Sequence, residues 1–401
     1  MTGLSEEQRL MRQSCRDFVD DVVIPFIRAN WQREWVMTPE NRLPNDILEG
    51  AEKVGIRTLG VPEEFGGVEL DPRSEVRTFA LISEEIARGD SGLADKLVQN
   101  WKVSVLLRQF APKHLQEKWF KRLLEDPQFL LAHCLTEPRG ASDRWLPYNV
   151  PEAAMQTRAV KADGGWVING RKHFITHGAE ADYVILFAVT DPGKGARGGI
   201  SCFLVDTDTP GFEVGRRQRT MYDEHQAELV FTDCRVGEDA LLGKEGYGFY
   251  SAMRWINGGR VSIAAMAVGV AQHLYERMLE YAKVREAFGR RIGANQYVQA
   301  MIVDTLAELT QARLLVYDLA ARLDAGADGR QEAAMAKYVS TEMVGRVADR
   351  AIQVFGGNGY MTEMGVERWA RFVRAMRLYE GTSEILKTNI ARTLGLEEAS
   401  R

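Results

Sequence analysis

The chain has few of the residues that build metal and disulfide sites. Its 401 residues include four cysteines and six histidines. The cysteines, Cys15, Cys134, Cys202 and Cys234, are far apart and show neither a Cys-x-x-Cys pair nor a metal-ligand spacing with histidine. This pattern excludes the common zinc and iron–sulfur motifs and a disulfide framework. It is typical of small buried residues in a reducing compartment, so we expect a cytoplasmic protein without a metal.

Long apolar runs and a surplus of positive charge are missing as well. No stretch approaches the roughly 18 apolar residues of a membrane helix, and the first residues, MTGLSEEQRLMRQ, do not look like a targeting segment. The formal net charge is −5, whereas proteins that bind nucleic acid usually present a basic face. We therefore expect neither a membrane nor a nucleic acid among the partners.

The spacing of apolar residues predicts a helical part at each end of the chain, which is long enough for two or three domains. Residues 4–29 have the pattern of a helix that closes at Pro25. Further helices are expected at 45–54, 72–87, 91–110, 113–124, 297–323, 331–354 and 365–378. One more is expected at 249–285, broken or softened near Asn257-Gly258-Gly259.

The middle of the chain has the pattern of strands. Short apolar runs at 129–135, 155–160, 166–168, 183–189, 200–205 and 227–231 predict strands, with a hairpin at Asp163-Gly164-Gly165. We therefore predict an α+β protein with three domains. These are an all-helical N-terminal domain at 1–127, a β-sandwich or barrel-like domain at 128–240, and a C-terminal four-helix bundle at 241–401.

Residues 351–386 contain the carboxylate that we select as a candidate base. Three glycines follow an apolar helical run at 356–359, which ends a helix and exposes backbone amides. Further on, Gly381 breaks a helical pattern, and Thr382 or Ser383 is placed to cap the next helix. Glu380 therefore lies at a joint between two helices. A carboxylate there is either a solvated helix cap or, where it loses water, a stronger base.

Four motifs occur in an order that resembles one family. They are Leu135-Thr136-Glu137-Pro138 with Ser142, then Asn169 to Thr176, then Arg285 to Arg290 with Gln296, and finally Gln353 to Glu384. With them the whole chain resembles the acyl-CoA dehydrogenases, FAD enzymes that have a helical, a β and a four-helix domain in this order. The resemblance implies a homo-oligomer, dimer or tetramer, whose subunits share the flavin sites, and an electron-transfer flavoprotein as partner.

The resemblance also assigns residues that bind FAD. Around the flavin ring it implies contacts from Leu135 and Thr136, stacking by Phe174, which Ile175 follows, and a hydrogen bond from Thr176 to N5. At the pyrophosphate and adenine end it implies Arg285, Phe288 and Gln296 of a neighbouring subunit, with Gln353 and Gly357, while Thr382 and Glu384 lie beside the FAD. Without the family, the same segments indicate a strand-ending turn, a hairpin with an aromatic core residue and a basic helix end.

For the reaction, the resemblance implies that Glu380 removes the α-proton of an acyl-CoA while the β-hydride passes to flavin N5. A few relatives carry the base just before an arginine on an earlier helix, but here Gly259 precedes Arg260. Glu380 is thus the one candidate at either position. The substrate-binding residues implied are Ser142, Asn257, Arg260, Tyr379 and Gly381. For Arg260, a buried helix-packing ion pair is the alternative.

Other interpretations stay open at this stage. An acyl-CoA oxidase would keep the fold and Glu380 but pass electrons to oxygen. A non-enzymatic binder with a flavin fold would need a basic surface, which the net charge of −5 does not favour. The loop from Arg144 to Pro151 is longer than in relatives, and we expect it to screen the CoA arm or narrow the entrance. His225 receives no role, and the sequence leaves the acyl chain of the substrate open.

Overall fold

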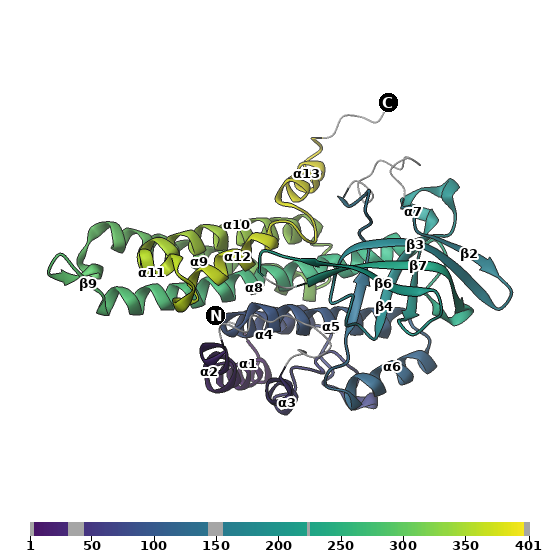
Figure 1. Ribbon diagram of the computed structural model, residues 1–401, viewed down its shortest axis with the longest axis horizontal. Coiled ribbons are helices and arrows are strands. Elements are labelled where there is room, and N and C mark those ends of the chain that lie inside the picture. Colours follow the sequence, from purple (N-terminus) through teal and green to yellow (C-terminus); the bar gives the residue numbers. More distant parts are fainter. Residues whose placement is uncertain (1–3, 31–43, 143–154, 223–224, 397–401) are drawn as a thin grey trace. The chain divides into compact units, whose positions relative to one another are not determined.

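The structure is a computed structural model that describes residues 4–30, 44–142, 155–222 and 225–396. It divides into two compact units (Figure 1). The helical unit comprises the described residues of Met1–Gln32, Leu70–Val98 and Asn257–Arg401. The β unit comprises those of Arg33–Glu69 and Gln99–Ile256. The proposed borders of the three domains stay predictions, because these compact units draw on segments that are distant in sequence.

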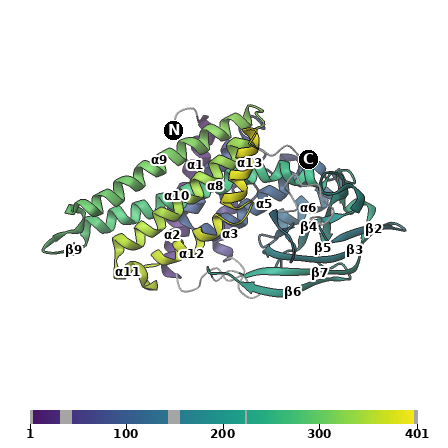
Figure 2. The ribbon, with the colours of Figure 1, turned by 90° about the horizontal axis from the view of Figure 1, so that it is seen from above.

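Most of the helical unit consists of helices. They are α1 (Glu6–Phe18), α2 (Ile24–Ala29), α4 (Glu75–Gly89), α9 (Gln296–Asp324), α10 (Arg330–Phe355), α11 (Gly357–Tyr360), α12 (Val366–Met376) and α13 (Ser383–Thr393). Helices α9 and α12 both contact α10, as the view from above shows (Figure 2). On α9 the buried stripe of Leu309, Ala312, Val316 and Leu319 has the spacing of an apolar helix face.

Two predicted interruptions of helices were wrong. The N-terminal helix passes Pro25, because a π turn at Val19–Val23 separates α1 from α2 and places Pro25 in the first turn of α2. Proline is tolerated there since its missing N–H is not needed. Helix α8 (Gly248–Val284) is continuous through the predicted break. Gly259 and Arg260 are buried, and this packing offsets the roughly 1 kcal/mol that a glycine costs inside a helix.

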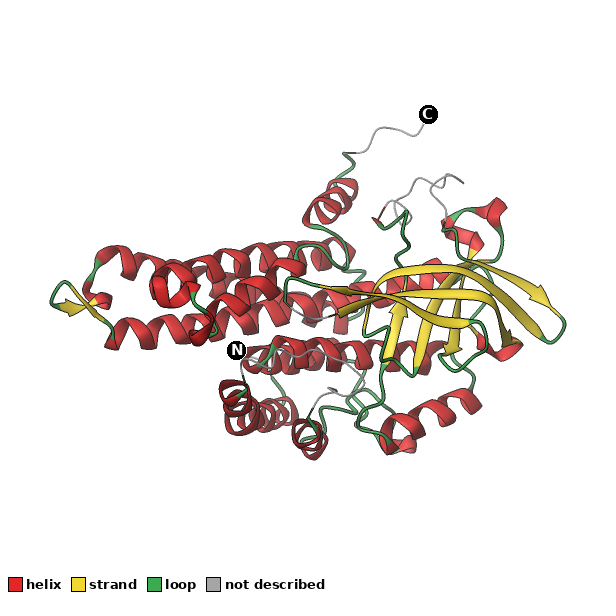
Figure 3. Ribbon diagram, viewed as in Figure 1, coloured by secondary structure: helices red, strands yellow, loops and turns green. Residues whose placement is uncertain are grey.

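Among its described residues, the β unit contains one eight-stranded sheet (Figure 3). Its strands are β1 (Leu131–Cys134), β2 (Arg158–Ala162), β3 (Gly165–Thr176), β4 (Tyr183–Val189), β5 (Ile200–Asp206), β6 (Phe212–Arg219), β7 (His225–Gly237) and β8 (Leu241–Leu242). The order is β6-β7-β3-β2-β4-β5-β8, and β1 pairs with β4 in parallel. The sequence did not predict β6 or β8, and β3 and β7 are longer than expected.

The sheet has a core on each face of β4. Tyr183, Ile185 and Phe187 pack with apolar residues of α5 (Ser91–Phe110) and α6 (Lys113–Glu125). The alternate residues Val184 and Leu186 pack with residues of β3 and β7. The sheet therefore folds over itself, in keeping with the barrel-like prediction. Burial on both faces explains why β4 is a continuous apolar run rather than an alternating one.

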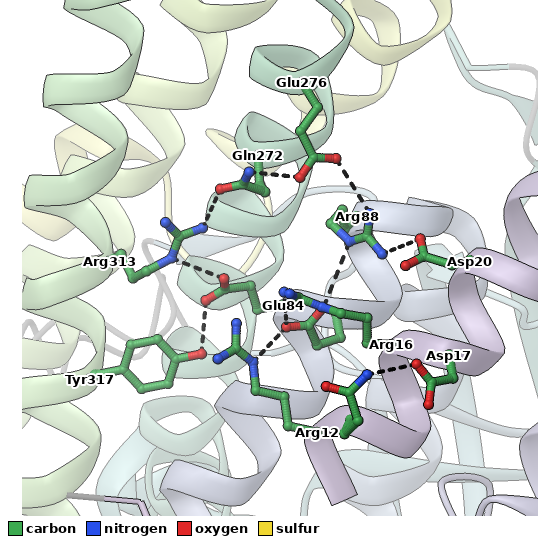
Figure 4. A network of polar contacts seen from close by, with 12 residues as sticks. Arg12, Arg16, Asp17, Asp20, Glu84, Arg88, Gln272, Glu276, Arg313 and Tyr317 are labelled. Carbon is green, nitrogen blue, oxygen red and sulfur yellow. Dashed lines mark hydrogen bonds and ion pairs between the residues drawn. The ribbon is translucent and has the colours of Figure 1, made fainter. Parts of the chain in front are cut away.

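A network of charged side chains holds the helices of the helical unit together (Figure 4). Glu84 of α4 accepts hydrogen bonds from Arg313 Nε at 3.0 Å and from the Tyr317 hydroxyl at 2.8 Å, both on α9. A Cβ at Gly269 of α8 would lie 2.1 Å from the Glu84 carbonyl oxygen. Glycine is therefore required where α8 passes α4.

Candidate active site

The strand-ending turn after β1 is tied to β3 by a buried ion pair. Lys172 has no exposed surface, and its Nζ donates to Glu137 Oε1 at 3.0 Å and to the Leu135 carbonyl at 3.2 Å. Next to it, the His173 N–H donates to the Thr136 carbonyl at 2.9 Å. The structure thus brings together the first two motifs, which the resemblance assigned to the flavin ring.

Glu137 is held ionised at this junction. Burial alone would raise its pKa, but the Lys172 charge and bonds from the N–H groups of Gln156 and Thr157 lower the pKa to about 2. A carboxylate that pairs with a cation and accepts backbone hydrogen bonds favours its charged form. The ion pair therefore stabilises the backbone of the turn and of β3.

The residues on β3 leave an aromatic ring uncovered. Phe174 is 60% exposed and has a positive φ of 55°, which is strained for a side chain of this size. Ile175, beside it, is buried in the core, and Thr176 is half-buried. The Nδ1 atom of His173 is buried and has no hydrogen-bond partner within the described part of the chain. An exposed ring next to a buried polar atom fits a flat ligand with polar edges, such as an isoalloxazine ring.

The predicted CoA segment is described only in part. Ser142, half-buried, is the last described residue before the gap at 143–154. The loop from Arg144 to Pro151 lies outside the described residues, so its role at the entrance stays a hypothesis.

In the helical unit, Glu380 lies in the turn between α12 and α13. Glu380 has φ 50° and Gly381 has φ 97°, so two consecutive residues adopt the left-handed region. Thr382, rather than Ser383, is the cap of α13, and its hydroxyl accepts the Ile385 N–H at 3.3 Å. The side chain of Glu380 is half-buried. The joint predicted around this carboxylate is therefore confirmed, although α12 ends at Met376 and the pattern suggested a later end.

Two buried cations bond to the backbone of this turn. Arg260 Nε on α8 donates to the Glu380 carbonyl at 3.3 Å, and its Nη1 donates to Asn257 Oδ1 at 3.3 Å. Lys337 Nζ on α10 donates to the Gly381 carbonyl at 2.8 Å. Burial lowers the pKa of both cations, against the opposing effect of the Glu380 charge, and brings the pKa of Lys337 to about 7. Arg260 thus bonds to the backbone of Glu380, the candidate base.

The fourth motif contacts the end of α8 that leads into the third motif. Asn358 Nδ2 donates to the Tyr281 hydroxyl at 3.0 Å, and the rings of Tyr281 and Phe355 stack 4.1 Å apart. Of the residues assigned to the pyrophosphate end, Arg285, Gln296, Gln353 and Gly357 are exposed, and Phe288 is 97% exposed with φ 53°. An exposed cation, Arg285, and the exposed glycine backbone suit an anionic ligand.

Comparisons with known proteins show which family the chain belongs to. Three family models match in sequence order: the N-terminal domain of acyl-CoA dehydrogenase at residues 5–126, the middle domain at 132–234 and the C-terminal domain at 246–395. A relative from Bacillus subtilis described as an acyl-CoA dehydrogenase is 35% identical over 98% of each chain. The chain belongs to the acyl-CoA dehydrogenase family. It is therefore an oxidoreductase that uses FAD.

Solved structures resemble this acyl-CoA dehydrogenase closely. Butyryl-CoA dehydrogenase from Megasphaera elsdenii has a TM-score of 0.87 and 32% identity, over 98% of this chain and 99% of the other. The structure of PigA with FAD and proline has a TM-score of 0.88 and 30% identity, over 99% of both chains. In the described part of the chain, no helix is both long and apolar enough to cross a membrane, and no group of three or more potential ligands could hold a metal.

Sequence reasoning missed two lysines that are fully buried, Lys172 and Lys337. Lys172 lies inside the second motif, Asn169 to Thr176, in which the resemblance gave it no role. Lys337 lies in Ala333-Ala334-Met335-Ala336-Lys337, where the four preceding residues are apolar and three of them are fully buried. A lysine on the apolar stripe of a helix is the signal that could have identified it, because lysine is rarely buried without a partner.

Proposed function

We propose that the protein desaturates an acyl-CoA thioester between its α and β carbons, with Glu380 as the base. The observation that carries this proposal is the Glu380 turn, in which a half-buried carboxylate sits on strained backbone whose carbonyls accept bonds from buried cations. Strain of about 1–3 kcal/mol persists only where the surroundings maintain it, and it is common at active sites.

The proposed reaction divides the two hydrogens of the substrate. Glu380 Oε takes the α-proton, and the C–H electrons form the new double bond as the β-hydrogen leaves with its own pair. FAD, when bound, supplies the acceptor for that hydride. The proton on Glu380 then passes to solvent. Because an α-proton next to a thioester is a weak acid, the thioester carbonyl must be polarised, and the backbone N–H of Glu380 is the donor that the family resemblance indicates.

Further residues of the chain hold substrate and cofactor in this proposal. Leu135, Thr136, Phe174, Ile175 and Thr176 hold the flavin ring, with the Thr176 hydroxyl donating to N5. Arg285, Phe288, Gln296, Gln353, Gly357, Thr382 and Glu384 hold the rest of FAD. Ser142, Asn257, Arg260, Tyr379 and Gly381 bind the thioester and its CoA arm.

A homo-oligomer is part of the proposal. Phe288, Tyr297 and Tyr360 are 97%, 89% and 79% exposed, and all belong to segments near the end of α8 and α10 that carries the Arg285 motif. Large exposed apolar side chains of this kind mark protein contacts. They support a second copy of the chain that shares the cofactor site. We further propose that the enzyme is cytoplasmic and that an electron-transfer flavoprotein accepts its electrons.

The experiment is anaerobic titration of the FAD-loaded protein with a panel of straight, branched, aromatic and cyclic acyl-CoAs. Acyl-CoA dehydrogenation bleaches the visible absorbance of FAD, and we expect one class to do so. Glu380→Gln removes the base with little change of volume and should slow bleaching by about 10³–10⁴-fold, the range typical of general base catalysis. Glu363→Gln, the same change at an exposed glutamate, is the matched control.

Two outcomes would contradict the proposal. Bleaching at the wild-type rate in Glu380→Gln would exclude Glu380 as the base, and no bleaching with any acyl-CoA would exclude the substrate class. Admitting oxygen after bleaching identifies the acceptor. Slow return of the absorbance supports a flavoprotein acceptor, whereas return within a turnover time would make the protein an oxidase.

A further inference from the structure

We propose that Lys337 is a positioning residue for the base: it fixes the Glu380–Gly381 turn through the Gly381 carbonyl and supplies a positive charge that attracts the Glu380 carboxylate. This inference rests on the proposed function, since it deepens the role of the same site. Lys337 lies outside the four motifs, and the family resemblance gives it no role.

The contact that carries the proposal is buried and direct. Lys337 has no exposed surface, and its Nζ lies 2.8 Å from the Gly381 carbonyl oxygen and 6.0 Å from the centre of the Tyr379 ring. Arg260 binds the preceding carbonyl, that of Glu380. Two cations on different helices therefore hold consecutive carbonyls of the strained turn. Hydrogen bonds from charged donors are the stronger kind, and these two oppose relaxation of the left-handed backbone.

The same helix closes the turn on both flanks. Glu342, five residues after Lys337 on α10, accepts from Ser383 Oγ at 2.6 Å and from Arg377 Nη1 at 2.8 Å. The Ser383 N–H in turn donates to the Arg377 carbonyl at 3.2 Å. A backbone hydrogen bond thus closes the turn from Arg377 to Ser383, and side chains of α10 bond to it. Of these α10 residues, Lys337 bonds to the position next to Glu380.

The charges that face Lys337 favour a role beyond packing. Three carboxylates act on it, Glu380 from the turn, Glu342 from α10 and Glu384 from α13, against one cation, Arg260 from α8. Glu342 already pairs with Arg377, and Glu384 is exposed. Since Coulomb interactions strengthen away from water, the Lys337 charge acts mainly on Glu380. The attraction acts on the charged carboxylate, the form that can accept a proton.

The effect of the Lys337 charge on Glu380 must weaken as the pH rises. Burial lowers the pKa of Lys337 to about 7. The positive charge is therefore present below about pH 7 and is lost above it, whereas the neutral amine can still donate to the Gly381 carbonyl. Removing Lys337 should cost more at pH 6, where charge and hydrogen bond both disappear, than at pH 9, where only the hydrogen bond does.

The test is Lys337→Met in the FAD-loaded protein, because methionine fills the buried site without charge. We expect a fall of kcat by about ten- to a hundred-fold at pH 6, the loss typical of a charge-assisted hydrogen bond. We expect a smaller fall at pH 9, a KM changed less than about threefold, and an acid limb of kcat/KM that moves to higher pH. Lys337→Arg should restore much of kcat and return the acid limb.

Controls separate this inference from a purely structural role and from failure of the proposed function. Lys387→Met, the same change at an exposed lysine of α13, should leave the pH profile unchanged. If Lys337→Met folds poorly, Lys337→Gln, which keeps a donor without the charge, should still shift the acid limb. An unchanged acid limb and kcat in Lys337→Met overturn the inference while wild-type bleaching by acyl-CoA stands. If none of the acyl-CoAs bleaches the FAD of the wild-type protein, the proposed function itself fails.

Discussion

Lys172 in the β unit and Lys337 in the helical unit are both completely buried, and the two lysines differ in what they bind. Lys172 of the β unit donates to the Glu137 carboxylate, which also accepts two backbone N–H groups. Lys337 of the helical unit donates to a backbone carbonyl next to Glu380. Burial carries a similar desolvation cost for both. For Lys172 the Glu137 carboxylate offsets this cost. For Lys337 the partner is an uncharged carbonyl, so more of the cost remains, beside the candidate base.

The difference is visible in the charge states. The Lys172 charge helps to lower the pKa of Glu137 to about 2, so this carboxylate is ionised at neutral pH and its ion pair serves the fold. Burial lowers the pKa of Lys337 to about 7, so this lysine can change its charge near neutral pH. Perturbed titration beside a carboxylate is typical of active sites, whereas fully paired buried charges are typical of structural contacts.

The largest expected effect comes from breaking the structural pair. Lys172→Met leaves Glu137 buried and without its cation, and removing one partner of a buried ion pair typically costs about 3–5 kcal/mol. We expect the urea midpoint of the holoenzyme to fall accordingly, with loss of FAD from the β3 segment. The double variant Lys172→Met/Glu137→Leu should recover a large part of the midpoint. A single variant as stable as wild type would refute the comparison.

A second structural charge should behave like Lys172 but more weakly. Arg313→Met removes one bond to the buried Glu84 and leaves the Tyr317 hydroxyl in place. We expect a loss of unfolding free energy of about 2–4 kcal/mol, read from urea unfolding at pH 7, without a shift in the pH profile of kcat/KM. A shifted profile with unchanged stability would mean that the Glu84 network serves catalysis.

Lys337 should leave a signature in the pH dependence of stability. An unfolded lysine keeps its proton to about its ordinary pKa of 10.5, whereas Lys337 in the fold loses it above about 7. The unfolded state therefore binds more protons in this window, and wild-type stability rises with pH. Between pH 7 and 9 the rise is about 2 kcal/mol. Lys337→Met should lack this rise, and urea unfolding at pH 7 and pH 9 would show the difference. An equal rise in wild type and variant would contradict the titration assigned to Lys337.

The smallest expected effect is at an exposed pair. Lys113 Nζ lies 2.7 Å from Glu64 Oε2, a shorter separation than that of the buried Lys172 pair, but both side chains are more than half exposed. Solvent screens such pairs. Lys113→Met should leave the thermal midpoint unchanged within error, and a drop comparable to that of Lys172→Met would show that distance rather than burial sets the energies.

Local patterns in the sequence predicted much of the fold and fewer of the contacts. The apolar run at 183–189 predicted β4, and Gly381 with Thr382 predicted the joint that positions Glu380. Strand β6 escaped notice because most of FEVGRRQR is exposed and shows no apolar alternation. The π turn at Val19–Val23 depends on main-chain bonding that leaves no residue pattern.

The contacts of the buried lysines could not be predicted from spacing. Lys337 and Gly381 are 44 residues apart, and Lys172 and Glu137 are 35 residues apart. The apolar stripe around Lys337 indicates burial, but neither segment indicates which group the ammonium contacts. Only the packing of α10 against the turn, and of β3 against the end of β1, decides that each ammonium loses its water.

The most direct measurement is the exchange of the substrate α-hydrogen for deuterium, followed by mass spectrometry in D₂O. The substrate is an acyl-CoA of the class that bleaches FAD, with sulfur in place of its β-carbon, so that it can lose an α-proton but no β-hydride. If Glu380 is the base, wild type exchanges the α-hydrogen, Glu380→Gln does not, and Lys337→Met exchanges more slowly, most clearly at pH 6. Exchange in Glu380→Gln at the wild-type rate would contradict the assignment of Glu380.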